Sequence, residues 1–323
     1  MATFNSSRDS ILLESGTNEV EFIEFYLGSI SYGINVSKVQ RVLARSSVDI
    51  TGVAQAPCGT IGMIHIQDKP IMLMDLKMSL GIPFDPEAIH PERQLVLVTT
   101  FNKQTTAFLI DGISKIHRTS WENFEPLNDK VTSEGAGGYS TGTVTFEDNI
   151  IVILDLERLM LSLLPASHGN VGVLESTEAR PERETVRILY AEDSKMVRGI
   201  TQDILNRSGY VQVDAFENGE DAYNFLLKRI REKDFDGEGP YDLVLTDIEM
   251  PKMDGLTLCR RVKTEACSNL PPKVVVYSSL INKEMALKCI SVGADAQLAK
   301  PDVSEIVSLI DSLCLEAPVG ANF

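Results

Sequence analysis

Residues 241–255 read YDLVLTDIEMPKMDG, a short apolar run that stops at the acidic residue Asp247. The turn-forming residues Pro251 and Gly255 follow before a helical pattern begins. An apolar run of this length, bounded by turn signals, predicts a buried strand. We therefore expect a strand that ends at Asp247 and a helix that begins at Gly255.

The same pattern recurs on both sides of this stretch. The predicted strands are 186–191, 211–216, 241–246, 273–278 and 295–299, and the predicted helices are 195–208, 219–233, 255–265, 282–292 and 302–315. Strands that alternate with helices predict a doubly wound α/β fold, a parallel sheet covered on both faces. Such sheets bind ligands at the carboxyl ends of their strands, so we expect the chemistry of this half there.

Polar residues stand at four of the predicted strand ends. They are Glu192, Asp193, Asp247, Ser278 and Lys300. Each alone is a weak signal, because an acidic residue after a strand is often a helix cap. Carboxylates gathered at one edge repel each other, so either their pKa values rise or a cation neutralises them. Mg²⁺ suits the set, because it takes one or two carboxylates together with phosphate oxygens.

Phosphoryl transfer to a carboxylate would use all of these groups. The transferred group carries its charge on three oxygens, and catalysis is mostly positioning and neutralisation of that charge. Mg²⁺ would take one oxygen, Lys300 would pair with another, and the Ser278 hydroxyl would donate to the third. Asp247 then supplies the attacking oxygen.

Four sequence blocks closely resemble the response-regulator receiver family, over about Val186 to Cys314. They are LYAEDS (189–194), LTDIEMPKMDG (245–255), VVYSS (275–279) and LAKP (298–301). The alternative is that all four are only caps and turns. The resemblance implies that Asp247 is the phosphorylation site and that Ser278 and Lys300 contact the phosphoryl group. It further implies that Glu192, Asp193 and Asp247, with the Glu249 backbone carbonyl, bind Mg²⁺.

One position departs from the receiver pattern. Receivers commonly carry an aromatic residue three positions before the lysine, and here that position is Gln297. Tyr277 alternates to the other side of its strand from Ser278, so it does not simply replace the missing aromatic. The resemblance therefore leaves open how phosphorylation is relayed within the domain.

The N-terminal half has a different pattern. Short β-type runs separated by turn residues predict an all-β barrel or sandwich with few helices. Residues 32–39 weakly echo 108–116, and 70–76 echo 150–156, so two related β subdomains or chance recurrence explain the pattern. No catalytic motif is present in this half, which favours a binding role.

A linker separates the halves. Residues 165–184, PASHGNVGVLESTEARPERE, lose hydrophobic periodicity and are rich in Gly, Pro, Ser and charge. We therefore predict an N-terminal segment (1–17), a first domain (18–164), a linker (165–184), a second domain (185–316) and a C-terminal tail (317–323).

Residues 18–164 contain segments that resemble the CheW family of chemotaxis coupling proteins. The segments are EFIEFYLGSISYGINVSKVQRVL (21–43), GMIHIQDKPIMLMDLKMSLG (62–81) and NIIVILDLERL (149–159). ILLESGTNEVEFIEF (11–25) and GISKIHRTSWENFEPLN (112–128) resemble CheV, the variant with a receiver behind its CheW-like domain. The resemblance implies a pair of interlocked small β-barrels that binds the CheA kinase and the cytoplasmic tips of chemoreceptors.

Two positions bear on docking. CheW sequences usually place an arginine in an Asn-Leu-Arg-Gly turn, whereas this chain has His65-Ile66-Gln67-Asp68, which puts partner affinity or choice in doubt. Trp121 is either a docking anchor or, as a lone tryptophan more often is, a core residue.

Composition bears on the kind of partner and on the cellular location. The formal net charge of −16 disfavours binding to a phosphate backbone, and neither half offers a basic recognition helix for a DNA-binding regulator. Five cysteines without C-x-x-C pairing favour reduced thiols. No signal peptide or membrane-spanning run is present, so we expect a cytoplasmic location without membrane insertion.

These observations predict a chemotaxis adaptor rather than an enzyme. It would couple receptors to the kinase, with the coupling modulated by Mg²⁺-dependent phosphorylation of Asp247. The alternative is a phosphate sink that drains phosphoryl groups from the kinase and uses the CheW-like domain only as a tether.

Overall fold

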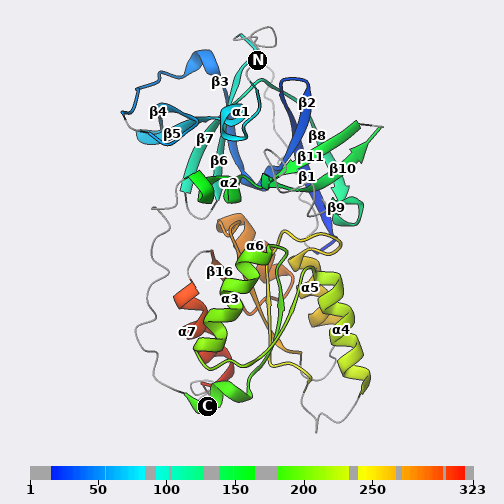
Figure 1. Ribbon diagram of the computed structural model, residues 1–323. Coiled ribbons are helices and arrows are strands. Elements are labelled where there is room, and N and C mark those ends of the chain that lie inside the picture. Colours follow the sequence, from blue (N-terminus) through cyan, green and yellow to red (C-terminus); the bar gives the residue numbers. More distant parts are fainter. Residues whose placement is uncertain are drawn as a thin grey trace, which may run out of the picture.

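The computed structural model describes residues 16–54, 56–83, 92–101, 104–126, 138–147, 149–163, 180–232, 239–266, 271–300 and 303–316. Within these ranges the chain forms a β-rich first domain that sits on an α/β second domain (Figure 1). Most of the predicted N-terminal segment, most of the predicted linker and the predicted tail lie outside the described residues.

Strands make up most of the described part of the first domain. Its strands are β1 (Glu19–Leu27), β2 (Ile30–Asn35), β3 (Val39–Ala44), β4 (Thr60–Ile66), β5 (Lys69–Asp75), β6 (Leu95–Phe101), β7 (Gln104–Ile110), β8 (Gly112–Ser120), β9 (Glu125–Pro126), β10 (Ser140–Phe146) and β11 (Asn149–Leu154). Its helices are α1 (Leu76–Ser79) and α2 (Leu156–Leu163). Short 3₁₀ turns occur at Val36–Lys38, Arg45–Ser47 and Trp121–Asn123.

These strands form two interlocked sheets. One sheet has the order β8-β1-β2-β11-β10-β9, and the other has the order β3-β6-β7-β5-β4. The chain therefore starts in the first sheet, crosses to the second and returns. Parallel pairing of β2 with β11 and of β5 with β7 closes the arrangement. The repeated sequences coincide with repeated structure, because hairpin β4–β5 leads into α1 as hairpin β10–β11 leads into α2.

The two sheets share a core. Phe25 from one sheet and Phe108 from the other are fully buried in the same hydrophobic cluster, together with Leu156 of α2. Trp121 is also a core residue, because it is only 7% exposed and packs edge-on against Phe22 and Phe124. Of its two interpretations, the structure supports the core one.

The second domain is the predicted doubly wound sheet. Its strands are β12 (Arg187–Ala191), β13 (Gln212–Phe216), β14 (Leu243–Thr246), β15 (Lys273–Ser278) and β16 (Ala296–Ala299). Its helices are α3 (Lys195–Arg207), α4 (Gly219–Glu232), α5 (Gly255–Arg261), α6 (Lys283–Ser291) and α7 (Val303–Cys314), with a 3₁₀ turn at Pro181–Thr185. The strand order is β13-β12-β14-β15-β16, and every pairing between neighbours is parallel.

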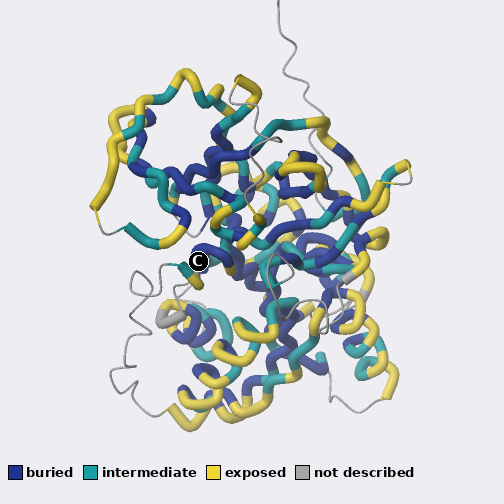
Figure 2. Tube along the Cα trace, turned by 45° about the horizontal axis from the view of Figure 1, so that its top comes forward, coloured by how far each residue is buried: buried dark blue, intermediate teal, exposed yellow. Residues whose placement is uncertain are grey.

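Helices cover both faces of this sheet. Buried side chains of α4, α5 and α6 pack in one hydrophobic cluster, and those of α3 and α7 pack in another. Buried residues accordingly concentrate in the interior of each domain (Figure 2). The predicted helix 255–265 is α5 followed by a π-helical turn at Val262–Ala266.

Candidate functional site

Three carboxylates meet at the carboxyl edge of the parallel sheet. Glu192 and Asp193 follow β12, and Asp247 follows β14, which is the strand beside it. Their ligand oxygens all lie within 4.8 Å of one another. Residues far apart in the sequence meet because neighbouring parallel strands end at the same edge. The structure thus brings together the predicted metal-binding side chains.

Lys300 completes this cluster from the end of β16. Its Nζ donates to Glu192 Oε2 at 2.7 Å and to Asp247 Oδ2 at 2.9 Å. Burial alone would lower the pKa of Lys300, but Asp247 and Glu192 raise it well above its ordinary value. The lysine is therefore a buried cation that neutralises part of the carboxylate charge.

The two adjacent acidic residues are strongly perturbed. Burial raises the pKa of Glu192 to about 7, with Lys300 opposing the change and Asp247 adding to it. Burial and the charges of Glu192 and Asp247 raise the pKa of Asp193 well above its ordinary value. The cluster sets three carboxylates against one lysine, so Lys300 alone does not balance its negative charge when all three are ionised.

One oxygen of the cluster is left without a partner. Glu192 Oε1 is buried and accepts no hydrogen bond from any described residue. Its other oxygen, Oε2, accepts from Lys300 and, at 3.5 Å, from the Tyr190 hydroxyl. A buried, unpaired carboxylate oxygen beside two further carboxylates is the donor set that a hard divalent cation such as Mg²⁺ prefers. The residues present therefore fit this ion.

The backbone around Asp247 is tightly folded. Asp247 Oδ1 accepts a hydrogen bond from the Ile248 amide at 2.6 Å, and the Gly255 amide donates to the Ile248 carbonyl at 3.0 Å. A Cβ atom at Gly255 would lie 1.7 Å from the Asp247 carbonyl oxygen. Only glycine fits there, which explains why the loop returns to α5 at this residue.

Ser278 lies beside this cluster. It is fully buried at the end of β15, and the Lys300 amide donates to its carbonyl at 3.2 Å. Its hydroxyl accepts from the Leu280 amide at 3.4 Å. The predicted serine and lysine thus occupy neighbouring strand ends.

The position that departs from the receiver pattern lies on β16. Gln297 is half-buried opposite Val276, while Tyr277 is buried with its ring centroid 5.8 Å from Lys300 Nζ. Tyr277 and Val276 belong to the hydrophobic clusters on opposite faces of the sheet, which agrees with the predicted alternation along the strand.

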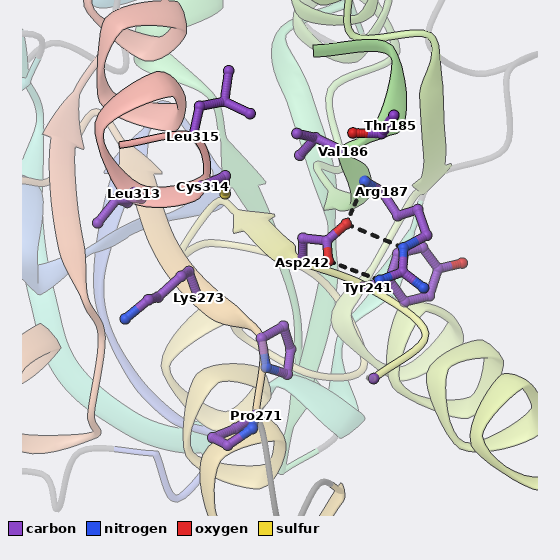
Figure 3. Close-up of a pocket in the computed structure, with 12 residues that line it drawn as sticks. Thr185, Val186, Arg187, Tyr241, Asp242, Pro271, Lys273, Leu313, Cys314 and Leu315 are labelled. Carbon is purple, nitrogen blue, oxygen red and sulfur yellow. Dashed lines mark hydrogen bonds and ion pairs between the residues drawn. The ribbon is translucent and has the colours of Figure 1, made fainter. Parts of the chain in front are cut away.

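A separate hollow lies at the opposite end of the same sheet (Figure 3). It has a volume of about 510 Å³ and is lined by residues at the amino-terminal ends of strands, including Arg187 and Lys273. The Arg187 guanidinium binds both carboxylate oxygens of Asp242, at 3.1 and 2.8 Å. Arg187 and Asp242 are thus held by the ion pair that they form with each other. The hollow is remote from the carboxylate cluster.

Comparisons with known proteins cover both domains. Residues 21–163 match the family model of the CheW-like domain, and residues 188–311 match that of the response regulator receiver domain. Chemotaxis protein CheV3 of Helicobacter pylori is 27% identical over 308 residues, with 92% of this chain and 95% of that protein covered. The chain thus combines a CheW-like domain with a response regulator receiver domain, and it is similar to this CheV protein over most of its length.

Further matches cover both domains or one of them. Chemotaxis protein CheV1 of Helicobacter pylori is 23% identical over 330 residues and covers 96% of this chain and 98% of its own length. The scaffolding protein TtCheW from Thermoanaerobacter tengcongensis is 20% identical, covers 44% of this chain and 87% of its own, and has a TM-score of 0.39. The two family models confirm the predicted CheW-like and receiver domains.

Further residues at the site come from the CheW-like domain and were missed by sequence reasoning. Lys38 Nζ lies 2.7 Å from Glu249 Oε2 and 3.0 Å from Glu157 Oε1. The Ser279 hydroxyl donates to Glu157 at 2.7 Å, and Asn35 donates to Glu249 at 2.8 Å. Burial would lower the pKa of Lys38, but Glu157 and Glu249 raise it well above its ordinary value. No local pattern marks these residues, because their partners lie far away in the sequence.

No helix in the described ranges combines the length and the apolar character that a bilayer crossing requires.

Proposed function

We propose that this chain couples cytoplasmic chemoreceptor tips to a CheA-type histidine kinase, and that phosphorylation of Asp247 modulates the coupling. The observation that carries the proposal is the cluster of Glu192, Asp193, Asp247 and Lys300 in a chain that also has a CheW-like domain. Relatives named as chemotaxis proteins CheV3 and CheW support the coupling role.

The side chains at the sheet edge divide the chemistry among them. Glu192, Asp193 and Asp247, with the Glu249 backbone carbonyl, would hold Mg²⁺, which when bound supplies positive charge to phosphoryl oxygens. The Asp247 carboxylate attacks the phosphorus of a phosphohistidine. The P–N bond breaks, a P–O bond to Asp247 forms, and the leaving imidazole takes up a proton from solvent.

Two residues respond to the new phosphoryl group. Lys300 exchanges its contact with the Asp247 carboxylate for one with a phosphoryl oxygen, and the Ser278 hydroxyl donates to another. The neutralising lysine is already in place, because its Nζ lies 2.9 Å from the acceptor carboxylate.

The test is the substitution Asp247→Asn, which keeps the shape of the side chain and removes the nucleophile. We expect it to abolish phosphoryl incorporation from the phosphorylated kinase. We also expect it to abolish any phosphorylation-dependent change in kinase activity within receptor arrays. Asp203→Asn, which removes an exposed carboxylate from α3, is the matched control and should behave like the unmodified chain.

A different outcome would favour the second function. If the unmodified chain accepts phosphoryl groups while kinase and receptor binding stay the same, modulation of coupling is ruled out. A phospho-form that then decays within seconds would identify a phosphate sink.

A further inference from the structure

The contact between the two domains is made on the loops that surround Asp247. We define the domain interface by Asn18, Asn35, Lys38, Trp121 and Glu157 of the CheW-like domain. On the receiver it uses residues 249–254, just after Asp247, and Ser279, just after Ser278. Helix α2, which begins at Leu156, faces the receiver at this point (Figure 1). The CheW-like domain therefore touches both loops that carry predicted phosphorylation residues.

Asn18 and Trp121 hold the backbone of the first loop. The Asn18 side chain donates to the Lys252 carbonyl at 2.6 Å and accepts from the Asp254 amide at 2.9 Å. The Lys252 amide donates to the Trp121 carbonyl at 3.2 Å. Lys252 itself has a φ of 63°, in the left-handed region that is unfavourable for lysine. The contacts from the CheW-like domain thus hold a loop in which one residue has an unfavourable backbone conformation.

Lys38 holds the side chain at the start of the same loop. It is buried between Glu157 of its own domain and Glu249 of the receiver. Glu249 lies two residues after Asp247, and its backbone carbonyl is the predicted additional metal ligand. Glu157 also accepts from Ser279, so one lysine and one glutamate connect the two loops. Phosphorylation of Asp247 would therefore affect the interface through Lys38, Glu157 and Glu249, which lie close to it.

The charge at this interface opposes an added phosphoryl group. The carboxylates of Glu157 and Glu249 face Lys38 next to the cluster that contains Asp247. Phosphorylation replaces the singly charged Asp247 carboxylate by an acyl phosphate with about two negative charges, so it adds about one negative charge and brings three phosphoryl oxygens that accept hydrogen bonds. It also draws Lys300 away from the carboxylates that it neutralises. Both effects add negative charge beside an interface in which one lysine, Lys38, is paired with two carboxylates, and this weakens the interface.

The interface is also of a kind that separates readily. Within the described residues, each hydrophobic cluster contains residues of one domain only. A cleft of about 590 Å³ lies between the domains, lined by residues of both. Polar interfaces between domains resemble transient protein contacts and permit relative motion.

We propose that the CheW-like domain docks on the loops around Asp247, and that phosphorylation of Asp247 weakens this docking. Lys38 and Asn18 are the positioning residues that the CheW-like domain supplies to the receiver site. This inference rests on the proposed phosphorylation of Asp247 and gives it a structural output. Coupling between two binding events is reciprocal. If phosphorylation weakens docking by a given factor, docking must therefore weaken binding of the phosphoryl group by the same factor.

Two backbone amides report on docking directly. The amides of Lys252 and Asp254 donate into the CheW-like domain, so their hydrogen exchange measures how often the interface opens. The experiment uses the full chain with Mg²⁺, with and without beryllofluoride, which takes the place of the phosphoryl group on Asp247. We expect exchange at these amides to become about tenfold faster with beryllofluoride, a typical coupling. Unchanged or slower exchange would overturn the proposal.

Substitutions in the CheW-like domain test the reciprocal effect. Asn18→Ala and Lys38→Met should speed exchange at Lys252 and Asp254 without beryllofluoride, and should tighten beryllofluoride binding about tenfold. Lys77→Met is the matched control, because Lys77 makes a similar ion pair with Asp111 inside the CheW-like domain. Beryllofluoride affinity equal to that of the unmodified chain in both interface variants would refute the role of docking. If Lys38→Met does not fold, the comparison of Asn18→Ala with the unmodified chain still tests the role of docking.

The two proposals fail in different ways. If beryllofluoride changes kinase and receptor binding but not exchange at the two amides, the proposed function survives and the docking mechanism falls. If exchange speeds up while kinase and receptor binding stay constant, phosphorylation opens the interface without modulating coupling.

Discussion

Asp254 supports the loop that follows Asp247, although it lies outside the carboxylate cluster. Its Oδ1 accepts from the Thr257 amide at 2.7 Å and its Oδ2 from the Thr257 hydroxyl at 3.0 Å, so it caps helix α5. Burial raises the pKa of Asp254 to about 6, although the hydrogen bonds from Thr257 and Leu256 oppose the shift. The ionised form of this cap is therefore costly to the folded protein.

The pKa of Asp254 gives a stability prediction with a definite sign. Because the folded protein binds this proton more tightly than the unfolded chain does, the contribution of Asp254 to stability is greatest below about pH 4 and is lost as the pH rises from about 4 to about 6. Asp254→Asn keeps a good cap and removes the titration. Relative to this variant, the unmodified chain should lose about 3 kcal/mol of unfolding free energy between pH 4 and 7.

Urea unfolding of both proteins across this pH range, with a chelator present, provides the measurement. The exposed control Asp203→Asn should follow the profile of the unmodified chain. If the unfolding free energies of Asp254→Asn and of the unmodified chain changed with pH in the same way, the raised pKa of Asp254 would be contradicted.

The individual site residues were largely predictable from the sequence. Glu192, Asp193, Asp247, Ser278 and Lys300 each lie at or just after the end of a strand, and strand ends in a parallel sheet converge on one edge whatever the details of packing. Their functional roles stay predictions, which the structure makes chemically coherent by placing the groups together.

Among the elements, the 3₁₀ turn Pro181–Thr185 ties the start of the receiver to its last helix. Arg183 is buried, and its guanidinium donates to Asp311 of α7 at 2.8 and 2.6 Å and to the Ser208 carbonyl at 2.9 Å. The Tyr210 hydroxyl also donates to Asp311. These hydrogen bonds lower the pKa of Asp311 even though burial favours the neutral acid. Residue 183, which falls in the predicted linker, thus packs with the receiver.

Removing Arg183, the partner of the buried Asp311 carboxylate, should lower the stability of the receiver. We expect Arg183→Met to reduce the unfolding free energy of the receiver by about 3–5 kcal/mol, because Asp311 keeps its burial and loses its ion pair. Denaturant unfolding followed by circular dichroism measures the change. Arg180→Met is the control, because the Arg180 side chain is 41% exposed and lies 3.7 Å from the same carboxylate. Its effect should stay below about 1 kcal/mol, and equal effects of the two substitutions would contradict the argument.

The elements were predictable to different degrees in the two domains. Each predicted strand and helix of the receiver corresponds to an observed one, since local periodicity distinguishes buried strands from amphipathic helices. In the CheW-like domain the runs were visible but their order in the sheets was not. The pairing of β2 with β11 is set by packing between distant segments and leaves no local pattern in the sequence.

For the whole molecule, the two hydrophobic interiors should unfold separately. Since the described hydrophobic clusters do not cross between domains, the domains are linked mainly by polar contacts. Scanning calorimetry should therefore show two transitions. Mg²⁺ with beryllofluoride should raise the receiver transition, and Arg183→Met should lower it, while the other transition stays nearly constant. A single transition that shifts as a unit in both experiments would contradict this expectation.

The domain interface is a further part of the molecule that the sequence did not predict. Asn18, Lys38 and Glu157 are ordinary polar residues in their own neighbourhoods. Their partners in the receiver are more than one hundred residues away, as for Ser279 and Glu157 with a separation of 122. Nothing in periodicity, capping or motif spacing encodes such a contact.

The interlocked sheets also bear on how this protein is made. Strand β2 ends at Asn35, but its parallel partner β11 does not begin until Asn149. While the ribosome synthesises the intervening chain, the hydrogen-bonding edge of β2 that β11 will occupy has no native partner. Open strand edges promote aggregation, so we expect the nascent CheW-like domain to be prone to aggregation until β11 has been synthesised. The receiver, whose strands pair in a compact order at the C-terminal side, emerges only after this vulnerable interval has passed.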